Sequence, residues 1–285
     1  MDRFPPTSRR TLLAALGGSL ATLLPASAKA GPIPSGEDGS CLLTPQTIEG
    51  PFYLDPKLMR SDITEGRAGV PLRLRLRVIE AGPCTPIAGA RVDIWHCDAK
   101  GLYSGYPGQG DSRSLDTSGQ TFLRGTQMTD AAGVVTFETI YPGWYAGRAT
   151  HIHLKAFLDA RTMLTGQIYF PDALNEFLYT QVPAYTGRRA ERFIVNANDG
   201  IANEEDPNRR AFCAVKEERD RYVASLTLGV DCSASGTDTE RAETLTALPE
   251  RPPRAGGSPP GLRGPGRSAL KDRLGALVPG LRREP

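Results

Sequence analysis

Histidine is scarce in this chain of 285 residues, which contains only His96, His151 and His153. An excess of one charge is also missing, because 34 Lys and Arg against 32 Asp and Glu leave a formal net charge of +2. Such a balance gives no reason to expect a nucleic acid or an acidic protein as a partner. No Cys-x-x-Cys pair occurs, which argues against a structural zinc knuckle. No internal repeat is evident.

The apolar segment near the N-terminus is not long enough to cross a membrane. The apolar segment 12–24 is too short, and too rich in Ala and Gly, to span a bilayer well. It follows the pair Arg9-Arg10 and precedes Ala28-Lys29-Ala30, a small-x-small cleavage pattern. Residues 1–30 are therefore predicted to be a twin-arginine-type export signal, with an uncleaved anchor as the alternative. We expect a mature chain that starts near Gly31 and is periplasmic or extracellular.

The rest of the chain divides into one domain and a tail. From residue 233 onward Pro, Gly and Arg dominate and apolar residues are sparse, which predicts a disordered tail over 233–285. Residues 31–232 are enough for a single domain. Five cysteines lie within it: Cys41, Cys84, Cys97, Cys213 and Cys232. In an exported protein they predict two disulfides and one remaining thiol, with the pairing left open.

Short apolar segments separated by turn residues predict an all-β domain. Residues 71–78 alternate apolar side chains with arginines, as expected for a strand with one face on a core. We expect the arginines to face water and to protect an edge of the sheet. With little amphipathic helix beside the strands, the fold class is an antiparallel β-sandwich with long loops that carry a mononuclear metal site. Further strands are predicted at 92–96, 134–140, 164–170, 191–195 and 222–230, and a helical turn at 173–179.

The pair His151 and His153 opens another short apolar run, bounded by Gly147 and Asp159. The shortness of this run favours a strand over a helix. Residues i and i+2 of a strand point to the same face, so the two imidazoles can hold one metal ion. The pattern alone fits equally well one histidine at a polar rim and the other packed inside.

Two tyrosines favour the metal site. Tyr145 lies six residues before His151 and follows the turn at Pro142-Gly143, so a loop can bring its phenol oxygen to the same ion. Tyr103, in a glycine-flanked segment after a strand, occupies a position where functional side chains are often presented. Either tyrosine could instead be a half-buried loop aromatic. A phenolate is a hard anionic ligand that suits Fe(III), and tyrosinate ligation of iron is known in catalase.

Together these residues predict a mononuclear non-haem ferric site made of Tyr103, Tyr145, His151 and His153. Two phenolates and two neutral imidazoles leave a ferric ion with a net charge of +1. A bound hydroxide would make the site neutral and could serve as a base. An open coordination position would make the site catalytic. The third histidine, His96, is expected to be structural.

The segments that carry these residues resemble the intradiol ring-cleavage dioxygenases, the family of protocatechuate 3,4-dioxygenase and catechol 1,2-dioxygenase. The likeness extends from about residue 44 to residue 230. It rests on Asp93-Ile-Trp-His-Cys-Asp98, Gly101-Leu-Tyr-Ser104, Tyr145 before Arg148, and His151-Ile-His153. Many members have Arg-Pro-Ala before the histidine pair, where this chain has Arg148-Ala-Thr150. The helical dimerisation region of catechol 1,2-dioxygenases has no counterpart here, so the closer likeness is to the protocatechuate type or an exported subgroup.

The resemblance implies one Fe(III) per chain, with Tyr103 and His151 as equatorial ligands and Tyr145 and His153 as axial ones. Tyr145 would leave the metal when a catechol binds, and its phenolate would take one of the two substrate protons. The reaction implied inserts both atoms of O2 between the hydroxyl-bearing carbons of the ring and gives a muconate-type dicarboxylate, as in the catabolism of aromatic compounds.

The resemblance also implies roles around the metal. Arg148 would stabilise negative charge on the substrate and Gln167 would orient that arginine. Pro51 and Phe52 would line the substrate pocket. The partners implied are a small aromatic diol and O2. Neither nucleic acid nor, after signal cleavage, a membrane is expected as a partner, and a homo-oligomer is left open.

Two other functions stay open at this point. Segment 86–94 also resembles strands of transthyretin-like binding domains, and a non-catalytic module of that kind would not bring the two tyrosines to the histidine pair. A zinc hydrolase could use the histidine pair and Cys97, with Asp98 or Asp159 as candidate general base.

Overall fold

The computed structural model describes residues 41–55, 57–159, 161–188 and 190–233. The predicted export signal at 1–30 and all but the first residue of the predicted tail lie outside this part of the chain. The described strands are β1 (Pro71–Glu80), β2 (Arg91–Trp95), β3 (Arg124–Met128), β4 (Val134–Ile140), β5 (His151–Leu158), β6 (Arg161–Tyr169), β7 (Ala214–Glu217) and β8 (Tyr222–Val230). The helices are α1 (Asp172–Gln181) and α2 (Gly200–Glu204). None of the described helices is long and apolar enough to cross a membrane.

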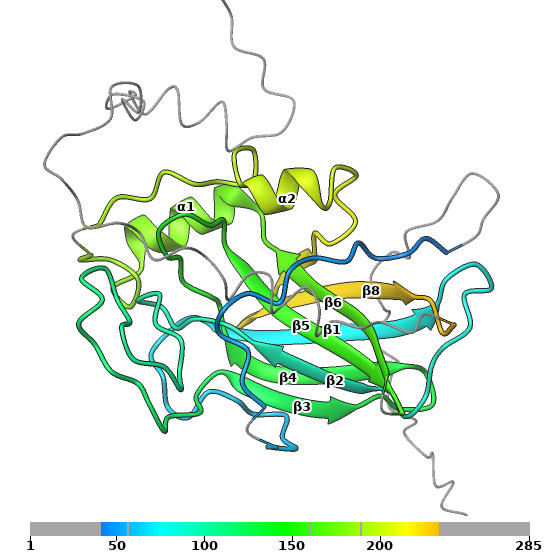
Figure 1. Ribbon diagram of the computed structural model, residues 1–285. Helices are drawn as coiled ribbons and strands as arrows, with labels where there is room; N and C mark the ends of the chain where they lie inside the picture. The colour runs from blue at the N-terminus through cyan, green and yellow to red at the C-terminus, as the bar shows by residue number, and fades with distance from the viewer. Residues whose placement is uncertain (1–40, 56, 160, 189, 234–285) are drawn as a thin grey trace, which may run out of the picture.

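The strands form two stacked four-stranded sheets, with both helices beyond one end of the strands (Figure 1). The first sheet has the order β4-β1-β8-β7 and the second has the order β3-β2-β5-β6. This arrangement confirms the predicted β-sandwich. All the neighbouring strands pair antiparallel except β1 and β8, which run parallel. No hairpin joins β1 to β8, because the other strands and both helices lie between them in the chain, so the two strands are free to run parallel.

The core lies between the two sheets and follows from period-two alternation. Leu72, Leu74 and Leu76 of β1 are buried, as the alternation of residues 71–78 predicts. Ile152 and Leu154 of β5 belong to the same core cluster. The arginines of β1 do not protect an edge, contrary to the prediction, because β1 lies between β4 and β8.

The second sheet is also buried on the face turned away from the first sheet. On β5 the core residues alternate with His151, His153 and Lys155, and all three are buried. His153 lies between Trp95 of β2 and Gln167 of β6, and His151 is opposite Tyr169 of β6. Residues of one row across a sheet point to one face. The side chains that therefore lie together on this outer face are those of Trp95, His151, His153, Gln167 and Tyr169. The loops and the arm of residues 41–53 cover it.

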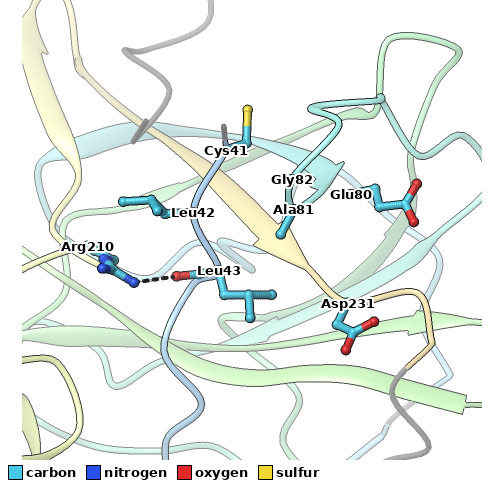
Figure 2. Close-up of a pocket in the computed structure, with 8 residues that line it drawn as sticks. All are labelled: Cys41, Leu42, Leu43, Glu80, Ala81, Gly82, Arg210 and Asp231. Carbon is cyan, nitrogen blue, oxygen red and sulfur yellow. Dashed lines mark hydrogen bonds between the residues drawn. The ribbon is translucent and has the colours of Figure 1, made fainter. Parts of the chain in front are cut away.

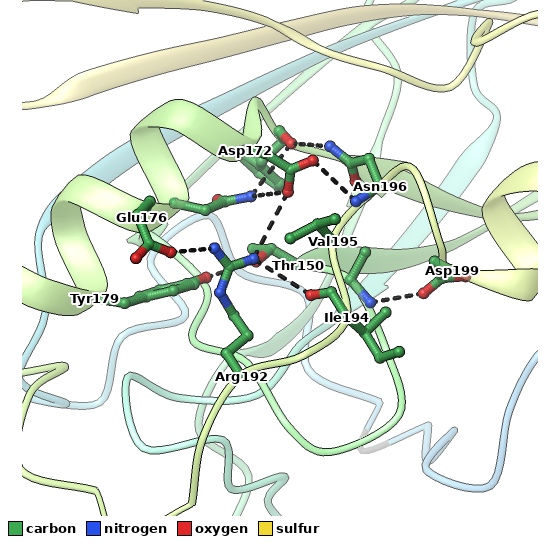
Figure 3. Close-up of polar contacts among 12 residues, drawn as sticks. Thr150, Asp172, Glu176, Tyr179, Arg192, Ile194, Val195, Asn196 and Asp199 are labelled. Atoms are coloured by element: carbon green, nitrogen blue, oxygen red, sulfur yellow. Dashed lines mark hydrogen bonds and ion pairs between the residues drawn. The ribbon is translucent and has the colours of Figure 1, made fainter. Parts of the chain in front are cut away.

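Some elements differ from the sequence prediction. Segment 191–195 forms no strand, because contacts with α1 replace a ladder there: the side chain of Arg192 donates to Glu176, and the backbone N–H of the nearby Asn196 donates to Asp172 (Figure 3). The strands β3 and β7 and the helix α2 were not predicted. β3 has no apolar alternation, yet it is buried because Arg124 bonds to the backbone carbonyls of Phe52 and Ser104.

The predicted pair of disulfides is wrong: one bridge, Cys41–Cys84, lies in the described residues. Cys97 and Cys213 are buried as free thiols and Cys232 is partly exposed. Cys97 packs with Trp95 on the outer face of the second sheet, whereas Cys213 belongs to the core cluster. A thiol on one side of a sheet cannot bond to a thiol on the other.

Candidate metal centre

Strand β5 places two imidazoles side by side at its start. The ring centroids of His151 and His153 are 4.6 Å apart, and their Nε2 atoms are 3.0 Å apart. Both side chains are buried. The shared face predicted from the His-x-His spacing is therefore present, and the two nitrogen atoms are close enough to contact one ion.

The backbone around the histidines fixes their orientation. Nδ1 of His151 lies 2.7 Å from the carbonyl oxygen of Ala149, so a proton on Nδ1 leaves the lone pair of Nε2 free for a metal. Trp95 stacks on the ring of His153 at 4.9 Å. On the arm, Gly50 contacts the same ring, and a Cβ there would lie 3.1 Å from its Cε1 atom. With a φ of +77°, that position also favours glycine for its backbone.

The two tyrosines complete the group. Oη of Tyr145 lies 3.0 Å from Nε2 of His151, so the loop folds back as the six-residue spacing predicts. The ring centroid of Tyr103 is 5.5 Å from that of Tyr145 and 6.0 Å from that of His153. Oη of Tyr103 is buried and has no hydrogen-bond partner in the described part of the chain. Two phenol oxygens and two imidazole nitrogens thus converge, and one of the oxygens lacks a protein partner.

The electrostatics of this group suit a cation. Burial lowers the pKa of His151 to about 3 and that of His153 well below its ordinary value, so both imidazoles are neutral and able to bind a metal. Burial raises the pKa of Tyr145 to about 12 and that of Tyr103 well above its ordinary value. Ionised phenols in this environment need a strong positive charge beside them. The donor set therefore fits Fe(III), which combines high charge with a preference for phenolate oxygen.

The two other functions considered from the sequence find no support at this site. Within the described residues, no group of three or more His, Cys, Asp or Glu side chains could hold a metal, so the zinc site with Cys97 is not formed. The tyrosines do reach the histidine pair, contrary to what a simple binding module predicts. His96 is structural as expected, because its ring nitrogens lie 2.8 Å from the carbonyl oxygen of Cys97 and 2.8 Å from the hydroxyl of Thr139.

Arg148 and Gln167 meet beside the four side chains. Nη2 of Arg148 donates to Oε1 of Gln167 at 2.5 Å and to the hydroxyl of Tyr169 at 3.3 Å. Nε of Arg148 donates to the carboxylate of Asp199 at 3.0 Å. Neither Tyr169 nor Asp199 was predicted from the sequence to lie at the site. An acidic residue just before the short helix α2 is a recognisable N-cap signal, but nothing in the spacing shows that it reaches Arg148.

The two tyrosines line a cavity of about 550 Å³. Pro51 and Phe52 lie in its wall, where the sequence analysis expected a pocket. The ring of Phe52 stacks on that of Tyr103 with centroids 4.5 Å apart. Asp111, Arg113 and Arg188 contribute charge to the wall. A flat aromatic molecule that enters this cavity therefore meets the rings of Phe52, Tyr103 and Tyr145.

Comparison with known proteins gives a consistent result. A family model described as "Dioxygenase" matches residues 48–182. Catechol 1,2-dioxygenase 1 of Acinetobacter lwoffii is 30% identical over 191 residues, which cover 59% of this chain and 58% of that protein. The protocatechuate 3,4-dioxygenase beta chain of Burkholderia cepacia is 35% identical over 131 residues, 41% of this chain and 52% of that one.

Among solved structures, an intradiol ring-cleavage dioxygenase from Tetranychus urticae superposes with a TM-score of 0.62 at 30% identity. The match covers 69% of this chain and 98% of that structure. Against the first curated relatives the chain spans less, 58% of one and 50% of another. Because the Tetranychus urticae structure is matched over almost its whole length, the chain belongs to the intradiol ring-cleavage dioxygenase family.

Proposed function

We propose that this chain is a ferric dioxygenase that cleaves a catechol-type ring between its two hydroxyl-bearing carbons. The observation that carries the proposal is the convergence of two phenol oxygens and two imidazole nitrogens beside a cavity whose wall includes Phe52, Tyr103 and Tyr145. Both oxygen atoms of O2 enter the product, the bond between the two carbons breaks, and a muconate-type dicarboxylate forms.

Tyr103, Tyr145, His151 and His153 would hold the iron, one ion per chain. When bound, Fe(III) supplies a Lewis acid that holds the diol as a catecholate and makes the ring reactive. The protein contributes a buried set of donors whose geometry is fixed by the sheet, since both histidines lie on β5 and Trp95 stacks on His153.

Proton movement falls to Tyr145. Its side chain lies in the wall of the cavity and its oxygen lies at the histidine pair, so one group can contact both an incoming hydroxyl and the metal position. A phenolate at this position can accept one of the two protons that a catechol must lose. Because burial raises the pKa of Tyr145 to about 12, the phenolate is a strong enough base once the metal no longer stabilises it.

Charge stabilisation falls to Arg148. Its side chain is only 14% exposed, and Gln167 and Tyr169 hold one end of its guanidinium group. A fixed cation in a site that excludes water stabilises negative charge that develops on the substrate, and it does so without reorganisation during the reaction. Gln167 therefore acts through Arg148 as well as by its place next to His153 in the sheet.

The substrate that we propose is a small aromatic diol, with O2 as the second substrate. The names of the relatives include both catechol and protocatechuate enzymes, which supports the shared ortho-diol and not one particular ring. We also propose that residues 1–30 direct export. Export through a twin-arginine route would deliver the folded domain with its metal already bound.

The visible spectrum of the purified protein tests the proposal. Loaded with one ferric ion per chain, the protein should be reddish through charge transfer from tyrosinate to iron, and anaerobic catechol or protocatechuate should shift the band to longer wavelength. Oxygen uptake and identification of a dicarboxylate by mass spectrometry then establish turnover. The His153→Ala variant and the zinc-loaded protein are controls that should be colourless. A fully iron-loaded protein without colour would overturn the proposal.

A further inference from the structure

A buried carboxylate outside the four candidate ligands lies against Arg148. The side chain of Asp199 is fully buried, and it comes from the segment before α2, about fifty positions along the chain from Arg148. We propose that Asp199 is a positioning residue that aims the guanidinium of Arg148 at the substrate. The inference rests on the ferric dioxygenase function proposed above.

The carboxylate bonds to both the side chain and the backbone at this point of the chain. Oδ2 of Asp199 accepts from Nε of Arg148 at 3.0 Å and from the backbone N–H of Ala149 at 2.6 Å. The same Ala149 offers its carbonyl oxygen to the ring of His151. One acidic group thereby fixes the arginine and the peptide that orients a candidate ligand.

The remaining donors of Arg148 show why its direction matters. Nε is engaged by Asp199 and Nη2 by Gln167 and Tyr169, so two edges of the planar group are held. None of these bonds uses Nη1, which leaves that nitrogen as a donor for a substrate. Since the guanidinium is rigid, fixing Nε and Nη2 also fixes the position of Nη1.

Asp199 is itself held by a rigid frame. Its backbone N–H donates to Val195, and the neighbouring Asn196 binds Asp172 of α1 and the carbonyl oxygen of Phe170. Arg192 attaches the same segment to α1 through Glu176 (Figure 3). A carboxylate on such a frame has the second layer of support that a precisely aimed site needs.

Charge agrees with this arrangement. Burial alone would raise the pKa of Asp199, but Arg148 and the two backbone N–H donors hold it below its ordinary value. Burial alone would likewise lower the pKa of Arg148, while Tyr145, Asp199 and Tyr169 raise it. Both groups are therefore charged and form a buried ion pair. Removing either partner would leave a buried charge without its counter-ion, which is costly.

A purely structural role is the competing explanation, because Oδ1 of Asp199 also caps α2 by accepting from the N–H of Ala202 at 2.9 Å. Asp206 supplies a matched control. It is fully buried too, and its carboxylate accepts from the backbone N–H groups of Arg210 and Ala211 at 2.8 and 2.9 Å. Both carboxylates support the loop, but the contacts of Asp206 do not include Arg148.

The experiment compares Asp199→Asn, Asp206→Asn, Arg148→Gln and the double variant D199N/R148Q, all in the full chain with one ferric ion. We expect D199N to lower kcat by about 10- to 100-fold, as second-layer substitutions do, while the protein still binds one ferric ion per chain. D206N should keep kcat within about twofold of the wild type. Its melting temperature should fall as much as that of D199N. In the R148Q background, D199N should change kcat by less than about twofold, because it acts through the missing arginine.

Two readouts separate the possible failures. In the metal-free protein, the double variant should lose less melting temperature than the sum of the single losses, and additive losses would overturn the contact. If the wild type turns over a catechol and D199N is equally fast, or if D199N and R148Q multiply, only the positioning role is overturned. If the iron-loaded wild type turns over no catechol, the proposed function fails, and the role of Asp199 fails with it.

Discussion

At the scale of the residue, the candidate metal centre combines imidazoles, which are ready to bind a cation when neutral, with phenols, which must lose a proton before they can bind one. Burial keeps the imidazoles of His151 and His153 neutral, which prepares them for a cation. The same burial keeps the phenols of Tyr103 and Tyr145 protonated when no cation is present. Loading with Fe(III) must therefore release two protons, and only a strongly charged ion compensates for ionising two buried phenols.

Replacing Tyr145 by Phe separates its two roles. The variant keeps Tyr103 and the histidine pair, so we expect it to retain part of its iron. It loses the phenolate that takes a substrate proton, and general-base contributions of this kind are worth about 10²- to 10⁴-fold in rate. Elemental analysis and oxygen uptake on a confirmed catechol measure the two effects. Tyr106→Phe is the control, because the hydroxyl of Tyr106 bonds to the backbone of Tyr53 and not to the site. An unchanged turnover rate in Tyr145→Phe would remove this role.

At the scale of the element, the pattern of apolar residues in the sequence predicted most of the strands. The strand β1 was predicted from the period-two alternation of residues 71–78, and β5 was predicted from the shortness of the apolar run that opens at His151. β3 was missed because its burial depends on Arg124, whose bonds go to distant backbone carbonyls. Segment 191–195 was wrongly predicted because its apolar letters fit a strand, while ion pairs with α1 hold it.

At the candidate site too, contacts that follow from local spacing were predicted, and contacts that depend on the fold were not. The convergence of His151, His153 and Tyr145 follows from local spacing, and the sequence alone predicts it. The contacts of Arg148 with Tyr169 and Asp199 join residues 21 and 51 positions apart, and only the fold brings them together. The burial of the outer face also escaped prediction, because a row such as His153 beside Gln167 depends on the strand register and not on either strand alone.

Arg188 is one of several side chains that attach the loop 107–120 to the site, beside Gln109 and Thr117, which bond to the backbone of Tyr103. Arg188 pairs with Asp111 on this loop, and its guanidinium lies 3.8 Å from the ring centroid of Trp144, next to Tyr145. It also donates to the carbonyl oxygen of Trp144. Because Arg188 and Asp111 both lie in the cavity wall, this contact ties the loop to the turn that carries a candidate ligand.

Arg188→Ala should therefore loosen the cavity wall without removing any candidate ligand. We expect KM for a catechol to rise by about fivefold, which corresponds to roughly 1 kcal/mol of lost stacking and pairing, while kcat changes less. Limited proteolysis should cut the loop 107–120 faster. Arg113→Ala is the control for proteolysis, since Arg113 is exposed on the same loop. Equal cutting of both variants would show that Arg188 does not restrain the loop.

At the scale of the whole molecule, the disulfide and the arm connect a remote corner to the site. Cys41–Cys84 fixes the start of the arm beside the ends of β1 and β8, where a second cavity of about 430 Å³ lies (Figure 2). There Arg210 donates to the carbonyl oxygen of Leu43 at 3.5 Å. Further along, the arm carries Gly50 against the ring of His153. Fixing the start of the arm thus restricts the segment that covers the candidate metal centre.

Removing this bridge by Cys84→Ser should reduce stability substantially. Closing a loop of 43 positions corresponds to about 4 kcal/mol in the chain-entropy description. Urea unfolding of the variant and of the wild type, each in the metal-free state, measures the loss. Cys232→Ser is the matched control, because Cys232 is a partly exposed free thiol, and it should cost no more than about 0.5 kcal/mol. A loss in Cys84→Ser as small as that of the control would contradict the expected contribution.

The pH dependence of stability is a property of the whole metal-free protein and comes mainly from its three histidines. Burial lowers the pKa of His96 to about 4, and those of His151 and His153 are lowered too. Groups whose folded pKa lies below the unfolded value bind fewer protons in the folded state. Their stabilising effect is therefore complete above pH 6.5 and is lost as the pH falls toward 4. Asp172 opposes this trend, because burial raises its pKa above the ordinary value, and the folded state therefore binds its proton more readily as the pH falls.

For His96 alone the shift from 6.5 to about 4 corresponds to about 3 kcal/mol across this interval. We expect the free energy of unfolding, measured by urea at pH 7, 5.5 and 4.5, to fall steadily in the wild type. The variant His96→Gln cannot titrate, and its amide can still bond to Thr139, so its curve should be flatter by that amount and its iron binding should persist. Parallel curves for the two proteins would mean that His96 does not contribute to the pH dependence, and loss of iron in the variant would contradict its assignment as a structural histidine.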